Sequence, residues 1–275
     1  MRAAIDFGIS NTDVVVDTGE GLTITTQPTL SDAPDEAVVA ALLRRCGVEL
    51  GSLDALAVVG GRSFGLGEAL GRCRVIKVNE ATAIGLGGQL RVKCADLLVV
   101  SAGSGTATVV ARGTHYAHGI GSAVGGGTLL GLSRLILGTA DPLAIDALAL
   151  AGDANGADLA LCDVINAPVG ALPSNATAVN FGRVARGALQ VRREDLAAAL
   201  VTMVGQVIGT IAVNAARVEG LSRLVVVGRL VALASVRRAI EETATLYSMD
   251  LLIPQDPGPV TALGALHYIN LEKQV

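Results

Sequence analysis

The stretch Gly121-Ser-Ala-Val-Gly-Gly-Gly-Thr-Leu-Leu-Gly-Leu132 decides the fold that we expect for this chain. Three consecutive glycines, Gly125 to Gly127, run directly into an apolar, helix-forming segment that extends from Thr128 to Leu137. Because glycine has no Cβ, a ligand can approach this backbone closely. A helix that begins here directs its first N–H groups and its positive dipole end towards that ligand. A phosphate group suits such a position, but glycine runs also occur in tight packing and in loops, so this stretch alone leaves both alternatives open.

A turn near the N-terminus favours the phosphate. A short strand is expected over residues 3–8, with Asp6 near its end, and Ile9-Ser-Asn-Thr12 then turns the chain into a second strand over 13–17. Hydroxyl and backbone N–H donors suit phosphate oxygens, and the Asp6 carboxylate suits a hydrated Mg²⁺ ion. By itself the segment could also be an ordinary polar hairpin turn.

The same pattern returns in the middle of the chain. Ala102-Gly103-Ser104-Gly105-Thr106 separates two expected strands, over 96–101 and 107–111, and the glycine stretch follows directly after them. Two hairpin turns of this kind can hold one polyphosphate from opposite sides. Their repetition makes the phosphate the better interpretation of all three segments.

The remaining chain alternates short buried strands with helices, which predicts an α/β fold. Glu80 stands in the first turn of a helix that begins at Asn79, where a carboxylate is either an ordinary partner of the helix dipole or a catalytic base. From the residues alone the structural alternative is favoured. The further expected strands are 22–26, 55–61, 74–78, 223–228 and 251–253, and the further expected helices are 35–45, 63–70, 196–218, 235–247 and 261–267.

Composition excludes several classes of protein. The chain has 275 residues, of which 51% are hydrophobic and 17% charged, as in a compact globular protein. Its net charge of −4 and the lack of a Lys/Arg cluster argue against nucleic acid or an anionic membrane as a partner. Polar residues interrupt the apolar segment 196–218, so no membrane span is expected. The four cysteines are scattered and are expected to be reduced, buried and structural. We therefore expect a cytoplasmic protein.

The two strand–turn–strand motifs, the glycine stretch and the expected strand that ends at Gly228 resemble the actin/hexokinase/Hsp70 (ASKHA) ATPase superfamily. Within it, residues 74–270 resemble type II (eukaryotic-like) pantothenate kinases. The segment Asp6–Val14 is equally similar to the opening of hydantoinase/oxoprolinase proteins of the same superfamily. The matching segments in the second half are Gly103-Ser-Gly105, Gly125–Leu132, Gly152-Asp153, Asn180-Phe-Gly182, Val225–Gly228 and Gly264-Ala-Leu266.

This resemblance implies two duplicated ribonuclease H-like (actin-like ATPase) α/β domains, expected over 1–92 and 93–275, with the nucleotide in an interdomain cleft. It implies a homodimeric kinase that uses ATP and Mg²⁺ to phosphorylate pantothenate or a similar small hydroxyl substrate. Asp6 would hold the metal and Glu80 would act as the catalytic base. Nucleotide contacts would come from Gly8, Ser10, Asn11, Thr12, Gly103, Ser104, Gly105, Thr106, Gly125, Gly126, Gly127 and Gly228, and substrate contacts from His118, Gly121, Ser122 and Asn180.

Several positions depart from the family pattern. Asp13 stands where the family usually has lysine, Ser101 replaces an asparagine, and His118 falls on an arginine position. The catalytic carboxylate can be matched in two registers, one on Glu80 and one on Val78, and the first keeps the carboxylate. These changes favour an alternative: a nucleotide-binding protein of the superfamily that acts on another metabolite or on a partner. A scaffold without nucleotide binding is the third hypothesis.

Overall fold

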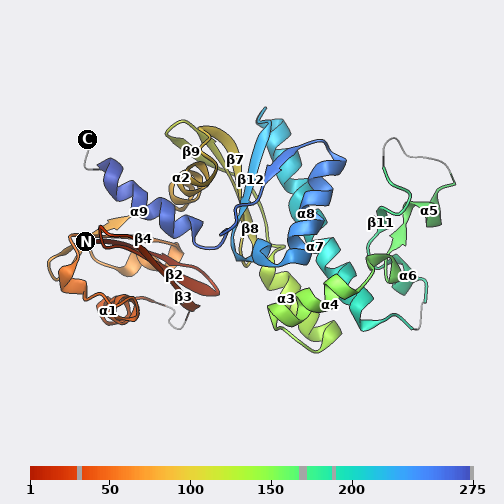
Figure 1. The fold of residues 1–275 in the computed structure, drawn as a ribbon, viewed down its shortest axis with the longest axis horizontal. Coiled ribbons are helices and arrows are strands. Elements are labelled where there is room, and N and C mark those ends of the chain that lie inside the picture. Colours follow the sequence, from red (N-terminus) through yellow and green to blue (C-terminus); the bar gives the residue numbers. More distant parts are fainter. Residues whose placement is uncertain (30–32, 167–171, 188–189, 273–275) are drawn as a thin grey trace. The chain divides into compact units, whose positions relative to one another are not determined.

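The computed structural model describes residues 1–29, 33–166, 172–187 and 190–272 of the chain (Figure 1). The chain forms two compact units. The first unit comprises residues 1–99, 109–119 and 254–275, and the second comprises 100–108 and 120–253. Residues 254–275, which the sequence-based division assigns to the C-terminal domain, therefore lie in the first unit.

The first unit is built on a six-stranded mixed sheet in the order β3-β2-β1-β4-β6-β5. Pairing is antiparallel between β1 and β2 and between β2 and β3, and parallel from β1 through β4 to β6. Successive residues of β1 point to opposite faces, so Ala3, Ile5 and Phe7 enter one core and Ala4 enters the other. The strands are β1 (Arg2–Phe7), β2 (Asn11–Asp17), β3 (Leu22–Pro28), β4 (Ala55–Val59), β5 (Ala69–Leu70) and β6 (Cys73–Lys77).

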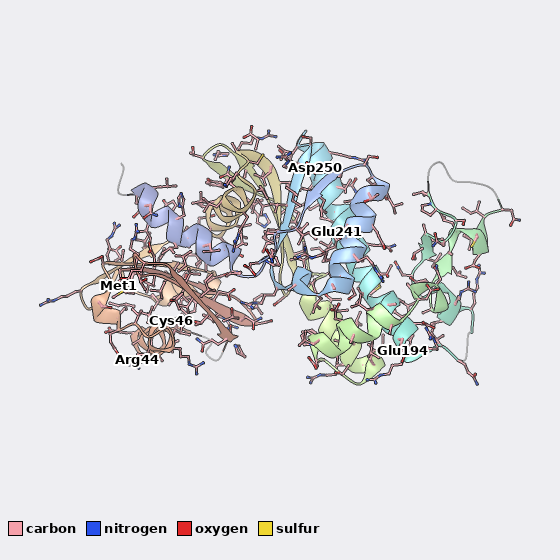
Figure 2. The ribbon with its side chains drawn as sticks, viewed as in Figure 1. Met1, Arg44, Cys46, Glu194, Glu241 and Asp250 are labelled. Carbon is pink, nitrogen blue, oxygen red and sulfur yellow. The ribbon has the colours of Figure 1, made fainter. Side chains whose placement is uncertain are left out.

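Helices cover both faces of this sheet. On one face lies α1 (Glu36–Arg45), which is capped by Asp35 at its start and by Cys46 at its end; Arg44 and Cys46 are labelled in Figure 2. On the other face lie α2 (Glu80–Val92) and α9 (Val260–Glu272). The two helices approach very closely, because a Cβ at Gly264 would lie 1.9 Å from the carbonyl oxygen of Ala83.

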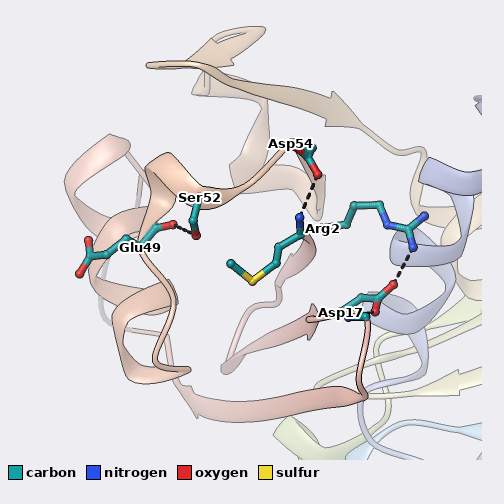
Figure 3. A network of polar contacts seen from close by, with 7 residues as sticks. Arg2, Asp17, Glu49, Ser52 and Asp54 are labelled. Carbon is teal, nitrogen blue, oxygen red and sulfur yellow. Dashed lines mark hydrogen bonds and ion pairs between the residues drawn. The ribbon is translucent and has the colours of Figure 1, made fainter.

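Ion pairs fasten the beginning of β1 to its neighbours (Figure 3). Arg2 Nη2 lies 2.7 Å from Asp17 Oδ2, at the far end of β2, and the N-terminal amine of Met1 lies 2.8 Å from Asp54 Oδ2, just before β4. The N–H of Gly19 and the Arg2 guanidinium both hydrogen-bond Asp17 and lower its pKa. These contacts fix the register of the sheet that carries the N-terminal turn.

A second sheet has five strands in the order β13-β12-β7-β8-β9. Residues of β7, β8 and β9 belong partly to each unit. In β7, four consecutive residues from Leu97 to Val100 are fully buried, whereas β9 is almost entirely exposed. The strands are β7 (Asp96–Ala102), β8 (Thr106–Arg112), β9 (His115–Ser122), β12 (Arg223–Val227) and β13 (Asp250–Leu252).

In the second unit, α7 (Arg193–Val218) and α8 (Ala234–Leu246) lie side by side (Figure 1). Glycines allow this approach, because a Cβ at Gly205 would lie 2.5 Å from Ala239 Cβ. Helix α7 is long and apolar enough to cross a membrane, but 61% of its apolar window is buried within the protein, as is usual for a core helix. The other elements are α3 (Gly126–Leu137), α4 (Pro142–Ala151), α5 (Leu161–Val164), α6 (Gly182–Ala185), β10 (Leu159–Ala160) and β11 (Thr177–Val179).

The expected α/β class is confirmed, with two local corrections. The helix expected over residues 63–70 is instead a 3₁₀ turn, Gly61–Gly65, followed by the two-residue strand β5. Gly65 and Gly67 lie within this segment, and glycine in its interior disfavours a helix. The first two residues of the glycine stretch, Gly121 and Ser122, instead end strand β9. The four cysteines are free, but the expectation that all are buried is wrong, because Cys162 is exposed and Cys46 and Cys94 are half-buried.

Candidate functional site

The turn between β7 and β8, residues 103–106, rests directly on the glycine loop in the second unit. The N–H of Gly126 donates to the carbonyl oxygen of Gly103, and that of Gly127 donates to Ser104, each at 2.8 Å. A Cβ at Gly125 would lie 2.8 Å from Gly105 Cα and from the Ser104 carbonyl oxygen. The first turn of α3 therefore holds the 103–106 turn in place, and only glycine fits at residue 125.

This geometry revises how the glycine loop works. From the sequence, the N–H groups of Gly125 to Gly127 are expected to face the ligand. In the structure the N–H groups of Gly126 and Gly127 are engaged by carbonyl oxygens of the protein's own turn. The Gly125 N–H has Thr128 Oγ1 as an acceptor at 3.4 Å. The loop thus shapes the 103–106 turn instead of presenting these donors outward.

Side-chain hydroxyl groups also hydrogen-bond the backbone just before the glycine loop, at residues 123 and 124. Thr106 Oγ1 donates to the Val124 carbonyl at 2.8 Å, and Ser122 Oγ accepts from the Val124 N–H at 3.0 Å. Thr128 Oγ1 also donates to the Ala123 carbonyl at 3.2 Å. Because the Thr106 hydroxyl is buried and occupied here, its contribution to the turn is structural.

At Gly228, the end of strand β12 also reaches the 103–106 turn. It directly follows β12, has a φ of 104°, and a Cβ on it would lie 2.3 Å from the carbonyl oxygen of Ala102. A side chain is excluded both by the conformation and by the contact. The ends of β7 and β12, the 103–106 turn and the glycine loop therefore meet within the second unit, as their sequence motifs suggest.

In the first unit, the turn from Gly8 to Asn11 joins β1 to β2 and is equally tight. A Cβ at Gly8 would lie 2.6 Å from the Asn11 carbonyl oxygen. Thr29 braces the turn: its hydroxyl donates to the Gly8 carbonyl at 2.9 Å and lies 3.1 Å from Thr12 Oγ1, and its N–H donates to the Ser10 carbonyl at 3.0 Å. The side chains of Ile9 and Ser10 are exposed. Sequence reasoning missed Thr29, because only the β2–β3 register brings it to the turn.

Two carboxylates face each other where this turn leaves the sheet. Asp6 on β1 and Asp13 on β2 are register partners, so their side chains lie on the same face. Asp6 is partly exposed, whereas Asp13 is buried and accepts a hydrogen bond of 2.5 Å from Thr26 Oγ1. Mg²⁺ in phosphate-binding sites is usually held by one or two carboxylates with waters and phosphate oxygens, so this donor set fits it.

Glu80 is the first residue of α2 and its side chain is exposed. The preceding Asn79 caps the helix, with Oδ1 accepting from the Ala81 N–H at 2.9 Å. Val78, the alternative register for the catalytic position, is 7% exposed and lies in the core beneath α9. Asp6 and Glu80 both stand at the carboxyl edge of the parallel strands β1, β4 and β6. The register that places the catalytic position on Glu80 therefore supplies an accessible carboxylate, whereas the register on Val78 supplies a buried aliphatic side chain.

The predicted substrate residues lie apart in the secondary structure. His118 and Gly121 are exposed residues of β9, and Ser122 ends that strand. Asn180 follows β11, and its Nδ2 donates to Gln206 Oε1 at 3.1 Å and to Asp158 Oδ2 at 3.5 Å.

Asp158, which sequence reasoning missed, is fully buried. It accepts a 2.6 Å hydrogen bond from the Phe181 N–H, and burial raises the pKa of its carboxyl. The Asn180 amide is thus part of a network that holds a buried carboxylate. The only sequence signal for this network was the Asn180-Phe-Gly182 motif that follows β11.

The chain matches the Fumble family over residues 89–265. It is 24% identical over 229 residues to a type II pantothenate kinase of Bacillus cereus, covering 81% of this chain and 83% of that protein. It is 36% identical over 132 residues to pantothenate kinase 1 of Oryza sativa subsp. japonica, covering 46% of this chain and 20% of that protein.

Two solved structures share the fold of the whole chain. The activator of the 2-hydroxyisocaproyl-CoA dehydratase from Clostridium difficile, with bound ADPNP, superposes with a TM-score of 0.66 at 17% identity and covers 100% of this chain and 97% of its own. A ROK family glucokinase from Streptomyces griseus, in complex with glucose and AMPPNP, gives 0.62 at 13% identity and covers 97% and 98%. At these identities the likeness shows the fold alone, which is that of the ASKHA ATPases.

Proposed function

This chain belongs to the Fumble family, the type II pantothenate kinases of the ASKHA superfamily, and we propose that it transfers the γ-phosphoryl group of ATP to pantothenate. The observation that carries the proposal is the convergence of the 103–106 turn, the glycine loop and Gly228 in the second unit. Gly125 and Gly228 each approach neighbouring backbone closely enough to require glycine, and such glycine-dependent backbone packing supports a phosphate-binding turn.

The nucleotide contacts in this proposal come from two turns. Ser10, Asn11 and Thr12, with Gly8, form the first, and Gly103 to Thr106 form the second. Since the Thr106 hydroxyl is occupied by the Val124 carbonyl, Thr106 would contact the nucleotide only through its backbone. Gly125 to Gly127 support the second turn, and Gly228 packs against the Ala102 backbone, which keeps the end of β12 next to that turn.

Magnesium is part of the proposal, with Asp6 as its ligand and Asp13 as the facing carboxylate. The ion would neutralise charge on the phosphate oxygens during transfer. Replacing Asp6 by Asn should abolish the Mg²⁺ dependence of the rise in melting temperature that ATP causes, because the amide cannot supply the anionic oxygen. A thermal-shift titration with ATP, with and without Mg²⁺, measures this without any turnover. An unchanged Mg²⁺ dependence in that variant would exclude Asp6 as a ligand.

Glu80 is the proposed base. Its carboxylate accepts the proton of the acceptor hydroxyl while that oxygen forms its bond to the γ-phosphorus and ADP departs. The exposed position of Glu80 at the start of α2 leaves its carboxylate open to a substrate. We propose that His118, Gly121 and Ser122 of β9 contact the acceptor, with Asn180 near it.

The test is ADP release measured with and without pantothenate. We expect pantothenate-dependent release that falls about 10²–10⁴-fold in Glu80→Gln, the usual loss on removal of a general base. Binding of Mg·ATP, followed by thermal shift, should stay unchanged in this variant. The matched control is Glu36→Gln, because Glu36 is also an exposed glutamate in the first position of a helix, α1. Full activity in Glu80→Gln would refute the assignment of the base.

A second candidate function is a kinase that acts on another metabolite or partner. It is favoured by the changes at three positions: Asp13 and His118 alter the charge pattern of the family, and Ser101 replaces a neutral amide by a hydroxyl. It predicts that Mg·ATP raises the melting temperature but that pantothenate does not stimulate ADP release. In that case a panel of small hydroxyl compounds replaces pantothenate in the same assay. A chain whose melting temperature does not respond to Mg·ATP would contradict both candidates.

We also propose that the active form is a homodimer, as the family resemblance implies. Light scattering coupled to gel filtration should give twice the 27.7 kDa mass of the chain. A monomer that retains full activity would refute this.

A further inference from the structure

A small cavity lies within the first unit, between the β2–β3 end of the sheet and α1. Its volume is about 140 Å³. Phe7, Val38 and Leu42 supply apolar wall, and two prolines, Pro28 and Pro34, also line it. A cavity of roughly 150 Å³ can hold a six-carbon ring. The space therefore suits a compact body of about four to six carbon atoms.

One polar side chain in this wall lacks a partner. Gln27 is only 9% exposed, and its Nε2 has no hydrogen-bond partner among the residues that the structure describes. The orientation of the amide is fixed chemically, because Arg45 Nη1 donates to Gln27 Oε1 and a guanidinium has no acceptor to offer an NH₂ group. A buried donor left unsatisfied costs about 1–3 kcal/mol, so a bound acceptor at this position would be stabilising.

Charge selects the kind of acceptor. The cationic side chain of Arg45 also lines the cavity, and none of the other described residues in its wall carries a charge. An anionic oxygen would therefore meet the Gln27 NH₂ group and the Arg45 cation, and its apolar part would lie against Val38 and Leu42. A cationic head group of the same size would be repelled.

We propose that this cavity is a binding site for a small aliphatic monocarboxylate. The cavity adjoins the proposed phosphate contacts and shares Thr12 with them, and Thr29, which also lines it, braces the Gly8 turn. Binding here requires neither ATP nor pantothenate. Failure of this proposal would therefore leave the proposed kinase function untouched.

The experiment follows the side-chain NH₂ resonances of Gln27 by nitrogen–proton NMR, assigned through their loss in Gln27→Met. Titration with 3-methylbutanoate should shift them saturably. Acetate has the same carboxylate but lacks the branched aliphatic chain, and 3-methylbutylamine has that chain with a cationic amine in place of the carboxylate. Neither compound should shift the Gln27 resonances as much as 3-methylbutanoate does. Gln27→Met keeps the volume but removes the donors, and should weaken 3-methylbutanoate binding about tenfold or more, as seen from the methyl resonance of Val38.

A pair of alanine substitutions on α1 tests the location. Ala41 is exposed and lines the cavity, so Ala41→Phe should block 3-methylbutanoate. Ala37 is exposed one turn earlier on the same helix and does not line the cavity, so Ala37→Phe should leave binding intact. Unshifted Gln27 resonances in the native chain would mean that the cavity holds water only and would overturn the proposal. Equal shifts with acetate, or undiminished binding in a folded Ala41→Phe variant, would overturn it as well.

Discussion

At the scale of single residues, Asp195 in the first turn of α7 connects the start of that helix to the turn over residues 153–156. Its carboxylate accepts hydrogen bonds from the Asp153 N–H at 2.9 Å and from Arg192 Nη2 at 2.6 Å. Gly156 is packed so closely that a Cβ there would lie 2.5 Å from Asp195 Oδ2. The hydrogen bonds from Arg192 are the main reason that the pKa of Asp195 is lowered.

This lowered pKa has a defined pH signature. The stability contributed by the Asp195 carboxylate is fully present above the ordinary aspartate pKa and is lost as the pH falls through the lower folded pKa. Asp195→Asn should lower the free energy of unfolding by about 1 kcal/mol at pH 7, since Arg192 is well exposed and solvent weakens the pair. Below that folded pKa the variant and the native chain should converge. Urea unfolding at several pH values measures this.

The matched control is Asp250→Asn. Asp250, labelled in Figure 2, pairs with Arg223 at 3.0 Å, but both side chains are about half exposed. Surface pairs of this kind contribute little, so the control should change stability by less than about 0.5 kcal/mol. A loss at Asp250 equal to that at Asp195 would contradict the importance of burial.

The candidate site shows what single residues reveal in a sequence. The glycines at 125 and 228 could be identified, because close backbone approach demands that residue type and leaves a visible pattern. The engagement of the Gly126 and Gly127 N–H groups could not, because the sequence does not say which carbonyl oxygens lie opposite them. The role of Thr29 was hidden for the same reason.

At the scale of elements, the crossing of α2 and α9 is set by glycines. A Cβ at Gly264 would lie 1.9 Å from the Ala83 carbonyl oxygen, and one at Gly87 would lie 2.2 Å from the Val260 carbonyl oxygen. Both obstacles are backbone atoms, which cannot move aside as a flexible side chain can. Gly264→Ala should therefore force the helices apart and reduce the free energy of unfolding by about 1–3 kcal/mol.

The control for this change is Gly131→Ala in α3. Gly131 is also within a helix, but the residue is exposed to solvent and a Cβ on it would meet nothing within 4 Å. Here the substitution should stabilise the chain by up to about 1 kcal/mol, because alanine favours the helix. Thermal unfolding of the two variants should move in opposite directions, and a shift of the same sign in both would refute the packing argument.

The elements that the sequence predicted well are those with strong patterns. The helices α1, α7 and α8 and the strands β7 and β12 agree with expectation to within about three residues. Strand β9 was missed because its residues, His115 to Ser122, are nearly all exposed and include two glycines, so no apolar alternation marks it. Its pairing with β8 at the edge of the sheet makes it a strand.

At the scale of the whole molecule, the two ends of the chain build one unit. Strands from residues 2–28 and the helix α9 from residues 260–272 share a core that contains Ala4, Val15, Ala265 and Ile269. Sequence patterns place a boundary along the chain but cannot show that its last helix returns to its first strands. That return depends on the fit of small residues between α9 and α2.

This arrangement predicts the effect of shortening the chain after Pro259. Loss of α9 uncovers fully or nearly fully buried residues on one face of the first sheet, among them Ala4, Val15 and Ile76. Each large aliphatic side chain that is uncovered costs about 1.5–3 kcal/mol, so the first unit should lose most of its stability. Hydrogen exchange should accelerate strongly in β1 and β4, whereas the amides of α7, whose core lies in the second unit, should remain protected.

A peptide of residues 254–275 added in excess should restore part of the protection in β1. Unchanged exchange in β1 after truncation would show that the sheet is stable without α9, and equal acceleration in α7 would show that the two units unfold as one.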